Sequence, residues 1–330
     1  MVTKIWTWGS GAAFGRELGT SCKNRSRRSH IATSIINDIN EKEGVHFLID
    51  SGAPCVEEMI DKDVKSPPDV LFITHSHKDH ISDLDKLANS RKRGIIFSKN
   101  KAKKKDEEKN FSVSPLPVIC TNDCLNHPIF GLKKDFDYLK SLNWIIIPSY
   151  DVWYSIRKRD YRLIPTSMIT DDTKCLDSKL VFPIEFKALP VYHAVQATGS
   201  CLYIFRIRSS GKDFGKRIVI SGDFESIEDN ILKNEDLKNP AFILLETNTI
   251  NATGTNHTNW IQNMKLLKQW ITGESYAYVL LNHLAGYEDW EQGCLDNIPD
   301  DKEWKETIFN FKLKNATIEI ATDGQDYTLK

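Results

Sequence analysis

Short apolar runs of strand length recur along the whole chain, and stretches with helical periodicity separate many of them. This mixture predicts an α/β protein whose strands and helices alternate in two similar halves. Helices are predicted near Ile81–Ser90, Phe130–Leu142, His257–Trp270 and Glu303–Phe311. The predicted strands are Lys4–Trp8, Ile31–Ile36, Val45–Ile49, Val70–Ile73, Ile95–Phe97, Val118–Cys120, Trp144–Ile147, Val181–Val191, Cys201–Ile207, Arg217–Ser221, Ala241–Glu246, Tyr278–Leu281, Ala316–Ala321 and Tyr327–Leu329. Asp323 and Gly324 lie between the last two strands and predict a β-hairpin there.

The composition is that of an ordinary globular protein, so it bears on function mainly by exclusion. With 330 residues, of which 40% are hydrophobic and 27% charged, the chain can bury a large core. The net charge of −1 gives no global attraction to nucleic acid, and no apolar run approaches the ~20 residues of a membrane-spanning helix. The first residues lack the apolar core of a signal peptide, and the seven cysteines include no C-x-x-C pair. We therefore expect a cytoplasmic protein with buried, reduced thiols and no membrane partner.

The segment Asp69–His80, D-V-L-F-I-T-H-S-H-K-D-H, carries the strongest chemical signal. A short apolar strand leads directly into His75, His77, Asp79 and His80. Imidazoles and carboxylates are ligands of zinc and neighbouring divalent metals. In an extended loop His75 and His77 point to the same side, while Asp79 and His80 follow at the turn into a helix, where they can face a second ion. The alternative is a polar loop with incidental histidines, but three of only nine histidines fall in this window.

The sequence T-H-S-H-K-D-H resembles the H-x-H-x-D-H signature of the metallo-β-lactamase superfamily. The resemblance implies a four-layer αββα sandwich of two mixed sheets, formed by residues 1–330 as a single domain, with a metal site at one edge. It also implies that Asp50, in the sequence Asp50-Ser51-Gly52, supports the metal loop without ligating a metal.

The segment from about residue 99 to 180 is longer than a minimal sandwich of this kind requires. We expect it to contain an inserted cap or lid on the active-site side, because functional variation in such folds is usually carried by loops. Its aromatic residues, which include Tyr150, Trp153, Tyr154 and Tyr161, can stack on a base, but we expect them to form a small core of their own. Residues 91–105 are rich in lysine and arginine and are interpreted as a solvated loop.

Further polar residues stand at the carboxyl ends of predicted strands, where such scaffolds place reactive groups: His193, Asp223, Glu246 and His283. The resemblance implies how the metal ligands divide. The ligands of a first metal are His75, His77 and His193, those of a second are Asp79, His80 and His283, and the carboxylate that bridges both is Asp223. The predicted cofactor is a pair of divalent ions. Zn²⁺ suits a set of histidines and aspartates, and Mn²⁺ or Fe²⁺ is compatible with the same ligand types.

A pair of cations would give this site hydrolytic chemistry. Two ions about 3.5–4 Å apart would share a bridging water and lower its pKa toward ~7, which yields hydroxide at neutral pH. The same ions would polarise the electrophile and neutralise charge on the leaving oxygen. Asp79, as a ligand of the second ion, is therefore counted among the predicted catalytic residues.

The C-terminal third resembles ribonuclease Z and related phosphodiesterases of the same superfamily. It contains, in order, the sequences L-L-E-T-N (Leu244–Asn248), N-H-T-N-W (Asn256–Trp260) and L-L-N-H-L-A-G-Y (Leu280–Tyr287). In those enzymes a glutamate after a strand orients a histidine that opens the next helix, and Glu246 and His257 occupy these positions. The resemblance implies that His257 donates a proton to the leaving alkoxide or stabilises the phosphorane oxyanion. It also implies that Glu246 holds the imidazole of His257 in the required tautomer. The alternative is that His257 is a surface residue at the start of a helix.

The resemblance to ribonuclease Z fails in the middle of the chain. The long arm rich in glycine and proline that grips tRNA is not recognisable, because glycine is sparse between residues 91 and 190. The expected function is therefore a dinuclear metal-dependent phosphodiesterase or nuclease, with RNA, DNA, a cyclic nucleotide or a small phosphodiester as substrate. The expected partner is that nucleic acid or nucleotide, and a homodimer is left open.

Three alternative functions remain open on the sequence. The first is a hydrolase of carbonyl esters, lactones or thioesters on the same metals. The second is a mononuclear iron oxidoreductase, which can retain the same histidines. The third is a binding protein that uses metals only as structural support, against which the complete ligand set argues.

Overall fold

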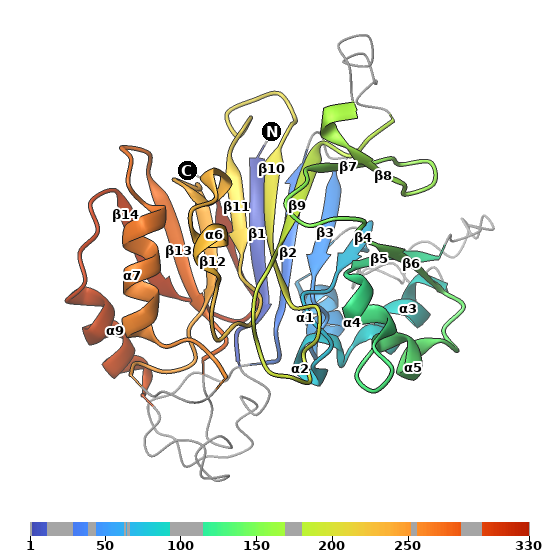
Figure 1. Ribbon diagram of the computed structural model, residues 1–330, viewed down its shortest axis with the longest axis horizontal. Helices are drawn as coiled ribbons and strands as arrows, with labels where there is room; N and C mark the ends of the chain where they lie inside the picture. The colour runs from blue at the N-terminus through green and yellow to red at the C-terminus, as the bar shows by residue number, and fades with distance from the viewer. Residues whose placement is uncertain are drawn as a thin grey trace.

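Two β-sheets packed face to face form the centre of the fold, and helices cover the outer face of each (Figure 1). The computed structural model describes residues 2–11, 29–38, 44–62, 64, 67–92, 115–168, 180–251, 256–284 and 299–329. Within these residues, one sheet has seven strands and the other has eight. The expected αββα sandwich of two mixed sheets is therefore confirmed.

The first sheet contains the early strands and the last strand of the chain, in the order β15-β1-β2-β3-β4-β5-β6. Their bounds are β1 (Val2–Gly9), β2 (Ala32–Asp38), β3 (Val45–Ile49), β4 (Val70–Phe72), β5 (Leu116–Cys120), β6 (Leu142–Ile146) and β15 (Gln325–Thr328). Strands β3 to β6 run parallel to one another, whereas β1 is antiparallel to both β2 and β15.

The second sheet has the order β14-β13-β12-β11-β10-β9-β7-β8. Its strands are β7 (Tyr154–Ile156), β8 (Leu163–Pro165), β9 (Ile184–Pro190), β10 (Cys201–Ile207), β11 (Arg217–Ile220), β12 (Phe242–Glu246), β13 (Ala277–Asn282) and β14 (Ala316–Ile320). Strands β11 to β14 are parallel, and β10 is antiparallel to both β9 and β11.

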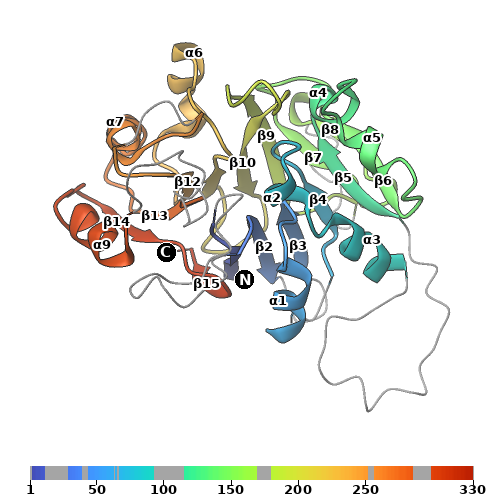
Figure 2. The ribbon, with the colours of Figure 1, turned by 90° about the horizontal axis from the view of Figure 1, so that it is seen from below.

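Helices lie on both outer faces, and Figure 2 shows α1 and α3 on one side of the sandwich and α6 and α7 on the other. The helices of the first half are α1 (Cys55–Asp61), α2 (Lys78–Ile81), α3 (Leu84–Lys92), α4 (Asn122–Asn126) and α5 (Leu132–Phe136). Those of the second half are α6 (Asp229–Leu232), α7 (Trp260–Trp270) and α9 (Asp301–Phe309), with short 3₁₀ turns at η2 (Thr166–Met168) and η4 (Glu235–Leu237). The buried apolar side chains form one layer between the sheets and one beneath the helices on each side.

Strand β4 is apolar throughout because both of its faces are covered. Val70 and Phe72 belong to the layer between the sheets, whereas Leu71 and Ile73 belong to the layer beneath the helices. All four side chains are fully buried. A strand of this kind shows no alternation of polar residues, and it holds the residues that follow, from Thr74 onward, at a fixed point on the sheet edge.

Phe186 in β9 provides a test of the central layer. Its ring centroid lies 5.0 Å from that of Phe72 and 5.8 Å from that of Tyr154. We expect Phe186→Ala to lower the free energy of unfolding by about 3–5 kcal/mol, because two stacked sheets cannot easily close the cavity. The control is Phe309→Ala, which removes a ring that is 74% exposed and should cost less than about 0.5 kcal/mol. Urea unfolding measures both variants, and equal losses would contradict the packing described above.

The predicted hairpin at Asp323 and Gly324 is wrong. The flanking strands lie in different sheets, since β14 pairs parallel with β13 and β15 pairs antiparallel with β1. A turn is present, and Gly324 adopts a positive φ of 68° there, a conformation that suits glycine. The local signal thus identified the turn correctly, but partners distant in the sequence decide which strands pair.

The described residues of the predicted insert extend both sheets. Strands β5 and β6 add to the first sheet, and the hairpin β7–β8, which the sequence did not predict, adds to the second. Tyr154 lies in the central layer, and Trp153 packs against the guanidinium of Arg206, 4.1 Å from the ring centroid. The expectation that these aromatic residues form a separate core is therefore wrong. The hairpin pairs with β9 at Phe186, near the end away from His193.

The division into a single domain with a lid stays a prediction. The described part of the segment belongs to the sandwich, and the rest lies outside the described residues. The predicted strand Ile95–Phe97 and the lysine-rich stretch after residue 92 also lie outside them. Among the helices that the structure describes, none has the length and apolar character needed to cross a membrane.

All four predicted helices, including the one that was expected to begin at His257, have different boundaries in the structure. The segment Ile81–Ser90 is divided between α2 and α3, because the backbone N–H of Asp83 donates to the carbonyl of Ser51 instead of continuing α2. The helix near Phe130–Leu142 is shorter, since Leu142 already begins β6. The C-terminal helix begins at Asp301, two residues earlier than expected.

His257 lies in a loop and does not open a helix. Helix α7 begins at Trp260, because Asn259 caps its N-terminus. The side chain of Asn259 accepts from the N–H of Gln262, whose side chain accepts in turn from the N–H of Asn259. This capping box fixes the start of the helix and leaves His257 before it.

Candidate metal centre

The carboxyl ends of several strands bring the predicted reactive residues to one edge of the sandwich. His75 follows β4 in the first sheet, while Asp223 and His283 follow β11 and β13 in the second. His193 follows β9, which runs in the same direction as β11 because both are antiparallel to β10. Parallel strands present their carboxyl ends at the same edge, so residues far apart in the sequence meet there.

All seven side chains predicted as metal ligands lie together at this edge. Their ligand atoms form two overlapping groups, in each of which the atoms lie within 4.8 Å of one another. One group consists of His75, His77, His193 and Asp223, and the other of Asp79, His80, Asp223 and His283. Asp223 belongs to both groups, and the binding of metal by these side chains stays a prediction.

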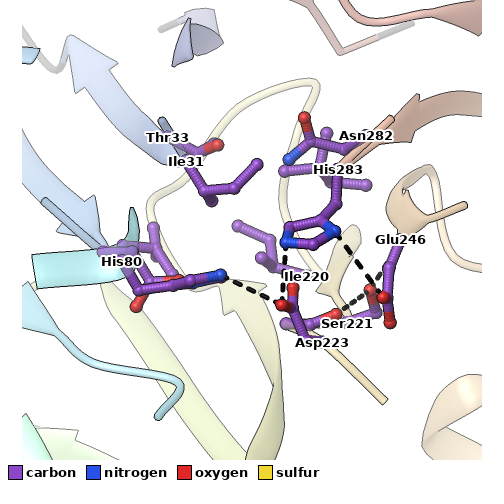
Figure 3. Close-up of a pocket in the computed structure, with 13 residues that line it drawn as sticks. Ile31, Thr33, His80, Ile220, Ser221, Asp223, Glu246, Asn282 and His283 are labelled. Carbon is purple, nitrogen blue, oxygen red and sulfur yellow. Dashed lines mark hydrogen bonds and ion pairs between the residues drawn. The ribbon is translucent and has the colours of Figure 1, made fainter. Parts of the chain in front are cut away.

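Asp223 lies at the centre, and Figure 3 shows its carboxylate facing His80 and His283. Its Oδ2 is 2.9 Å from His283 Nε2 and 3.2 Å from His80 Nε2. The same oxygen is 3.7 Å from His75 Nε2 and 3.8 Å from His193 Nε2. A carboxylate within reach of both groups suits a bridge between two cations.

Asp50 and Thr74 orient the histidines of the motif. His80 Nδ1 donates to Asp50 Oδ2 at 2.7 Å, and Thr74 donates to the same carboxylate from its N–H and its hydroxyl, both at 2.8 Å. The Thr74 hydroxyl also accepts from His75 Nδ1 at 3.1 Å. These bonds occupy both Nδ1 atoms and leave the Nε2 atoms available for a metal. The hydrogen bonds agree with the supporting role expected of Asp50.

The Asp50 contact predicts a measurable loss of metal affinity. In Asp50→Asn the charged partner of His80 is lost, and we expect binding of the second metal to weaken by about 10–100-fold. Titration of Zn²⁺ against a chromophoric chelator measures the affinity. Asp213→Asn is the matched control, because Asp213 is also buried but accepts from the N–H of Thr3 and lies between β10 and β11. Equal affinity in Asp50→Asn and the wild type would refute the supporting role.

The first group is held in the neutral form that binds metal. Burial lowers the pKa of His75 well below its usual range, and it also lowers the pKa of His77. Burial lowers the pKa of His193 to about 3, against the attraction of Asp223. Neutral imidazole is the ligand form of histidine, so this group requires no deprotonation at neutral pH.

The second group contains histidines surrounded by carboxylates. Burial alone would lower the pKa of His80, but Asp223, Asp50 and Asp79 outweigh it and raise that pKa well above the usual value. Asp223 raises the pKa of His283 in the same way, against burial. A cation placed among these carboxylates would take over the role of the two imidazolium charges.

The residues present fit a pair of divalent cations. The Nε2 atom of His75 is buried and has no hydrogen-bond partner among the described residues. Buried polar atoms are rarely left in this state, and a metal ion would satisfy this one. Each group supplies imidazole nitrogens and a carboxylate, a donor set that suits zinc and related first-row metals.

Glu246 lies at the end of β12 and links the metal centre to His257. His257 Nδ1 donates to Glu246 Oε1, and the N–H of Phe224 donates to Glu246 Oε2. His283 Nδ1 lies 3.7 Å from Glu246 Oε1, the contact drawn in Figure 3. The side chain of Glu246 is 1% exposed and that of His257 is 21% exposed. The structure thus brings the two predicted partners together and leaves the side chain of His257 partly exposed.

Among the described residues, seven other than glycine adopt left-handed backbone conformations, and three of them lie at this site. Asp50, Asn256 and His283 have φ values of 58°, 59° and 56°. Such conformations cost free energy in residues other than glycine, and they tend to occur where function requires a particular geometry. Their presence here indicates that the loops are held in place by their contacts.

Comparison with known proteins agrees with this geometry. Residues 36–118 match the family model described as the metallo-β-lactamase superfamily. The matched segment includes the motif residues His75, His77, Asp79 and His80. This superfamily consists generally of metal-dependent hydrolases. No curated protein sequence matched the chain.

Solved structures of the metallo-β-lactamase fold resemble the chain over nearly its whole length. A diphosphatase from the PhnP family is 16% identical with a TM-score of 0.63, and the match covers 98% of this chain and 97% of that one. Zn²⁺-bound PqqB from Methylobacterium extorquens is 10% identical with a TM-score of 0.60, covering 98% and 99%. The long form of RNase Z from yeast is 14% identical with a TM-score of 0.55, and 99% of this chain matches 42% of that one. At these identities the likeness establishes the fold alone.

Two supporting residues were not predicted from the sequence. Thr74 directly precedes the first histidine of the motif, and its hydroxyl can join Asp50 to His75, so its position was a usable signal. Asn256 accepts from His193 Nδ1 through its backbone carbonyl at 2.7 Å. A contact made by a main-chain atom does not depend on the residue type, so it could not be predicted from the sequence.

Proposed function

We propose that this protein is a phosphodiesterase that uses two divalent metal ions and acts on a nucleic acid or a nucleotide. The pairing of Glu246 with His257 beside the metal-ligand groups carries the proposal. Hydrolysis of a phosphodiester releases an alkoxide, which requires a proton, whereas a thioester releases a thiolate, which departs without one. The similarity to structures named as a diphosphatase and as an RNase Z supports a phosphate-containing substrate.

The two groups of side chains would hold the ions, with Asp223 shared between them. Bound there, two Zn²⁺ or Mn²⁺ ions would activate a water molecule and neutralise negative charge on the phosphate. The side chains themselves would keep the imidazole nitrogens aimed at the centre, because Asp50 and the Asn256 carbonyl hold His80 and His193 from behind.

His257 would act as the general acid. Its Nδ1–H is held by Glu246, so Nε2 is the atom that can deliver a proton to the leaving oxygen. Burial and the nearby Asp223 raise the pKa of Glu246, and the contact with His257 opposes that rise. Glu246 therefore fixes the tautomer and the orientation of the ring.

The test is a substrate panel. RNA, DNA, cyclic nucleotides and bis(p-nitrophenyl) phosphate would be compared with a lactone, a thioester and a β-lactam, each in the presence of Zn²⁺ or Mn²⁺. We expect turnover of phosphodiesters that stops on addition of a chelator, and His77→Ala serves as the blank. Turnover confined to carbonyl substrates, or one iron per chain with oxygen consumption, would refute the proposal.

A further inference from the structure

A single peptide unit joins a predicted metal ligand to the proposed acid. His193 Nδ1 donates to the carbonyl oxygen of Asn256 at 2.7 Å. That carbonyl belongs to the peptide bond between Asn256 and His257, and a peptide unit is rigid and planar. The orientation of the peptide unit that lets its carbonyl oxygen accept from His193 Nδ1 therefore also sets the direction of the backbone at His257.

The chain after His257 is anchored separately. The Thr258 hydroxyl donates to the carbonyl of Glu246 at 3.0 Å, and the N–H of Asn248 donates to the carbonyl of Thr258 at 3.0 Å. Asn263 Nδ2 donates to the same Glu246 carbonyl at 2.6 Å. His257 is thus tied to β12 on its C-terminal side and to His193 on its N-terminal side.

The His257 ring has little room to adjust. Its centroid lies 4.8 Å from that of His193 and 4.8 Å from that of His283. A rotation of the preceding peptide would change the distance of the ring from these neighbours. The same rotation would remove the acceptor of His193 Nδ1.

The conformation of Asn256 is what allows this arrangement. Its φ is 59°, in the left-handed region, which asparagine adopts more readily than most residues and which β-branched residues strongly avoid. We propose that Asn256 is a positioning residue that, through one peptide unit, aims His193 at the first metal and His257 at the substrate. The part that concerns His257 rests on the proposed function, and the part that concerns His193 does not.

Substitutions at Asn256 separate backbone conformation from side-chain chemistry. Asn256→Val disfavours the left-handed conformation, whereas Asn256→Gly permits it without the side chain. We expect the valine variant to bind the first Zn²⁺ about 10–100-fold more weakly, since His193 loses its acceptor. Turnover of a phosphodiester should fall mainly in kcat, with KM changed less. The glycine variant should lose clearly less Zn²⁺ affinity and less kcat than the valine variant, because glycine can keep the left-handed conformation.

The matched control is Asn315→Val, because Asn315 also has a positive φ, 66°, but lies directly before β14. This variant should lose thermal stability while keeping wild-type Zn²⁺ affinity, measured by competition with a chromophoric chelator. In a His193→Ala background, Asn256→Val should cause little further loss of affinity, because the contact is already absent.

Wild-type Zn²⁺ affinity in Asn256→Val would overturn the proposal, and so would a glycine variant as impaired as the valine variant. An additive effect in the His193→Ala background would also overturn it. If the wild type proves inactive on phosphodiesters, the proposed function fails, and the Zn²⁺ titrations still decide the role of Asn256.

Discussion

Asp223→Asn should abolish nearly all turnover and reduce the metal content from two ions to one or none. Asp223 belongs to both groups of ligand atoms, and its Oδ2 lies 2.9 Å from His283 Nε2 and 3.2 Å from His80 Nε2. Asparagine preserves the size of the side chain but cannot carry the negative charge that two neighbouring cations require. Losing several kcal/mol of transition-state stabilisation corresponds to a decrease in kcat/KM of at least about 10³-fold.

Metal analysis and steady-state kinetics on the purified variant measure these effects. Asp213→Asn again serves as the control, because it neutralises a buried carboxylate that bonds Thr3 and Lys216 instead of the histidines. Circular dichroism establishes that both variants fold. Two bound metals with wild-type turnover in Asp223→Asn would show that the shared carboxylate does not bridge the ions.

The sequence predicted the part of the site that one short segment contains. His75, His77, Asp79 and His80 lie within six residues after a buried strand, and this spacing alone indicates a metal site. Residues such as His193 and His283 are isolated in the sequence, and only the resemblance to a known family placed them with the others. Their proximity depends on strand direction and sheet stacking, which local patterns do not encode.

The fold shows the same division between local and distant information. Strands such as β4 and β12 were predicted because they are buried on both faces and, apart from Glu246 at the end of β12, lack polar residues. The pairing of β14 and β15 was predicted wrongly, because an Asp-Gly turn signals a hairpin although these strands join different sheets. The three-residue strands β7 and β8 were missed because runs so short show no periodicity.

His257→Ala should lower kcat by about 10²–10⁴-fold on phosphodiesters that release an alkoxide, without loss of bound metal. The ring is absent from the two groups made up of predicted ligands alone, but it forms a third group with Asp223, Glu246 and His283, and its Nδ1 lies 3.9 Å from Asp223 Oδ2. Its hydrogen bond is made to Glu246, so Glu246→Gln should show a smaller loss on the same substrates, through a wrongly oriented imidazole.

The leaving group distinguishes a proton donor from other roles. p-Nitrophenolate is a stable anion that departs without a proton, whereas an alkoxide does not, so a true general acid should matter much less for bis(p-nitrophenyl) phosphate than for a dinucleotide. Comparing kcat for these two substrates in the wild type and in His257→Ala measures the difference. An equal loss on both substrates would indicate that His257 stabilises the negative charge that develops on the phosphoryl oxygens in the transition state. No loss on either substrate would remove the observation on which the phosphodiesterase proposal rests, since the pair that it forms with Glu246 would then have no part in turnover.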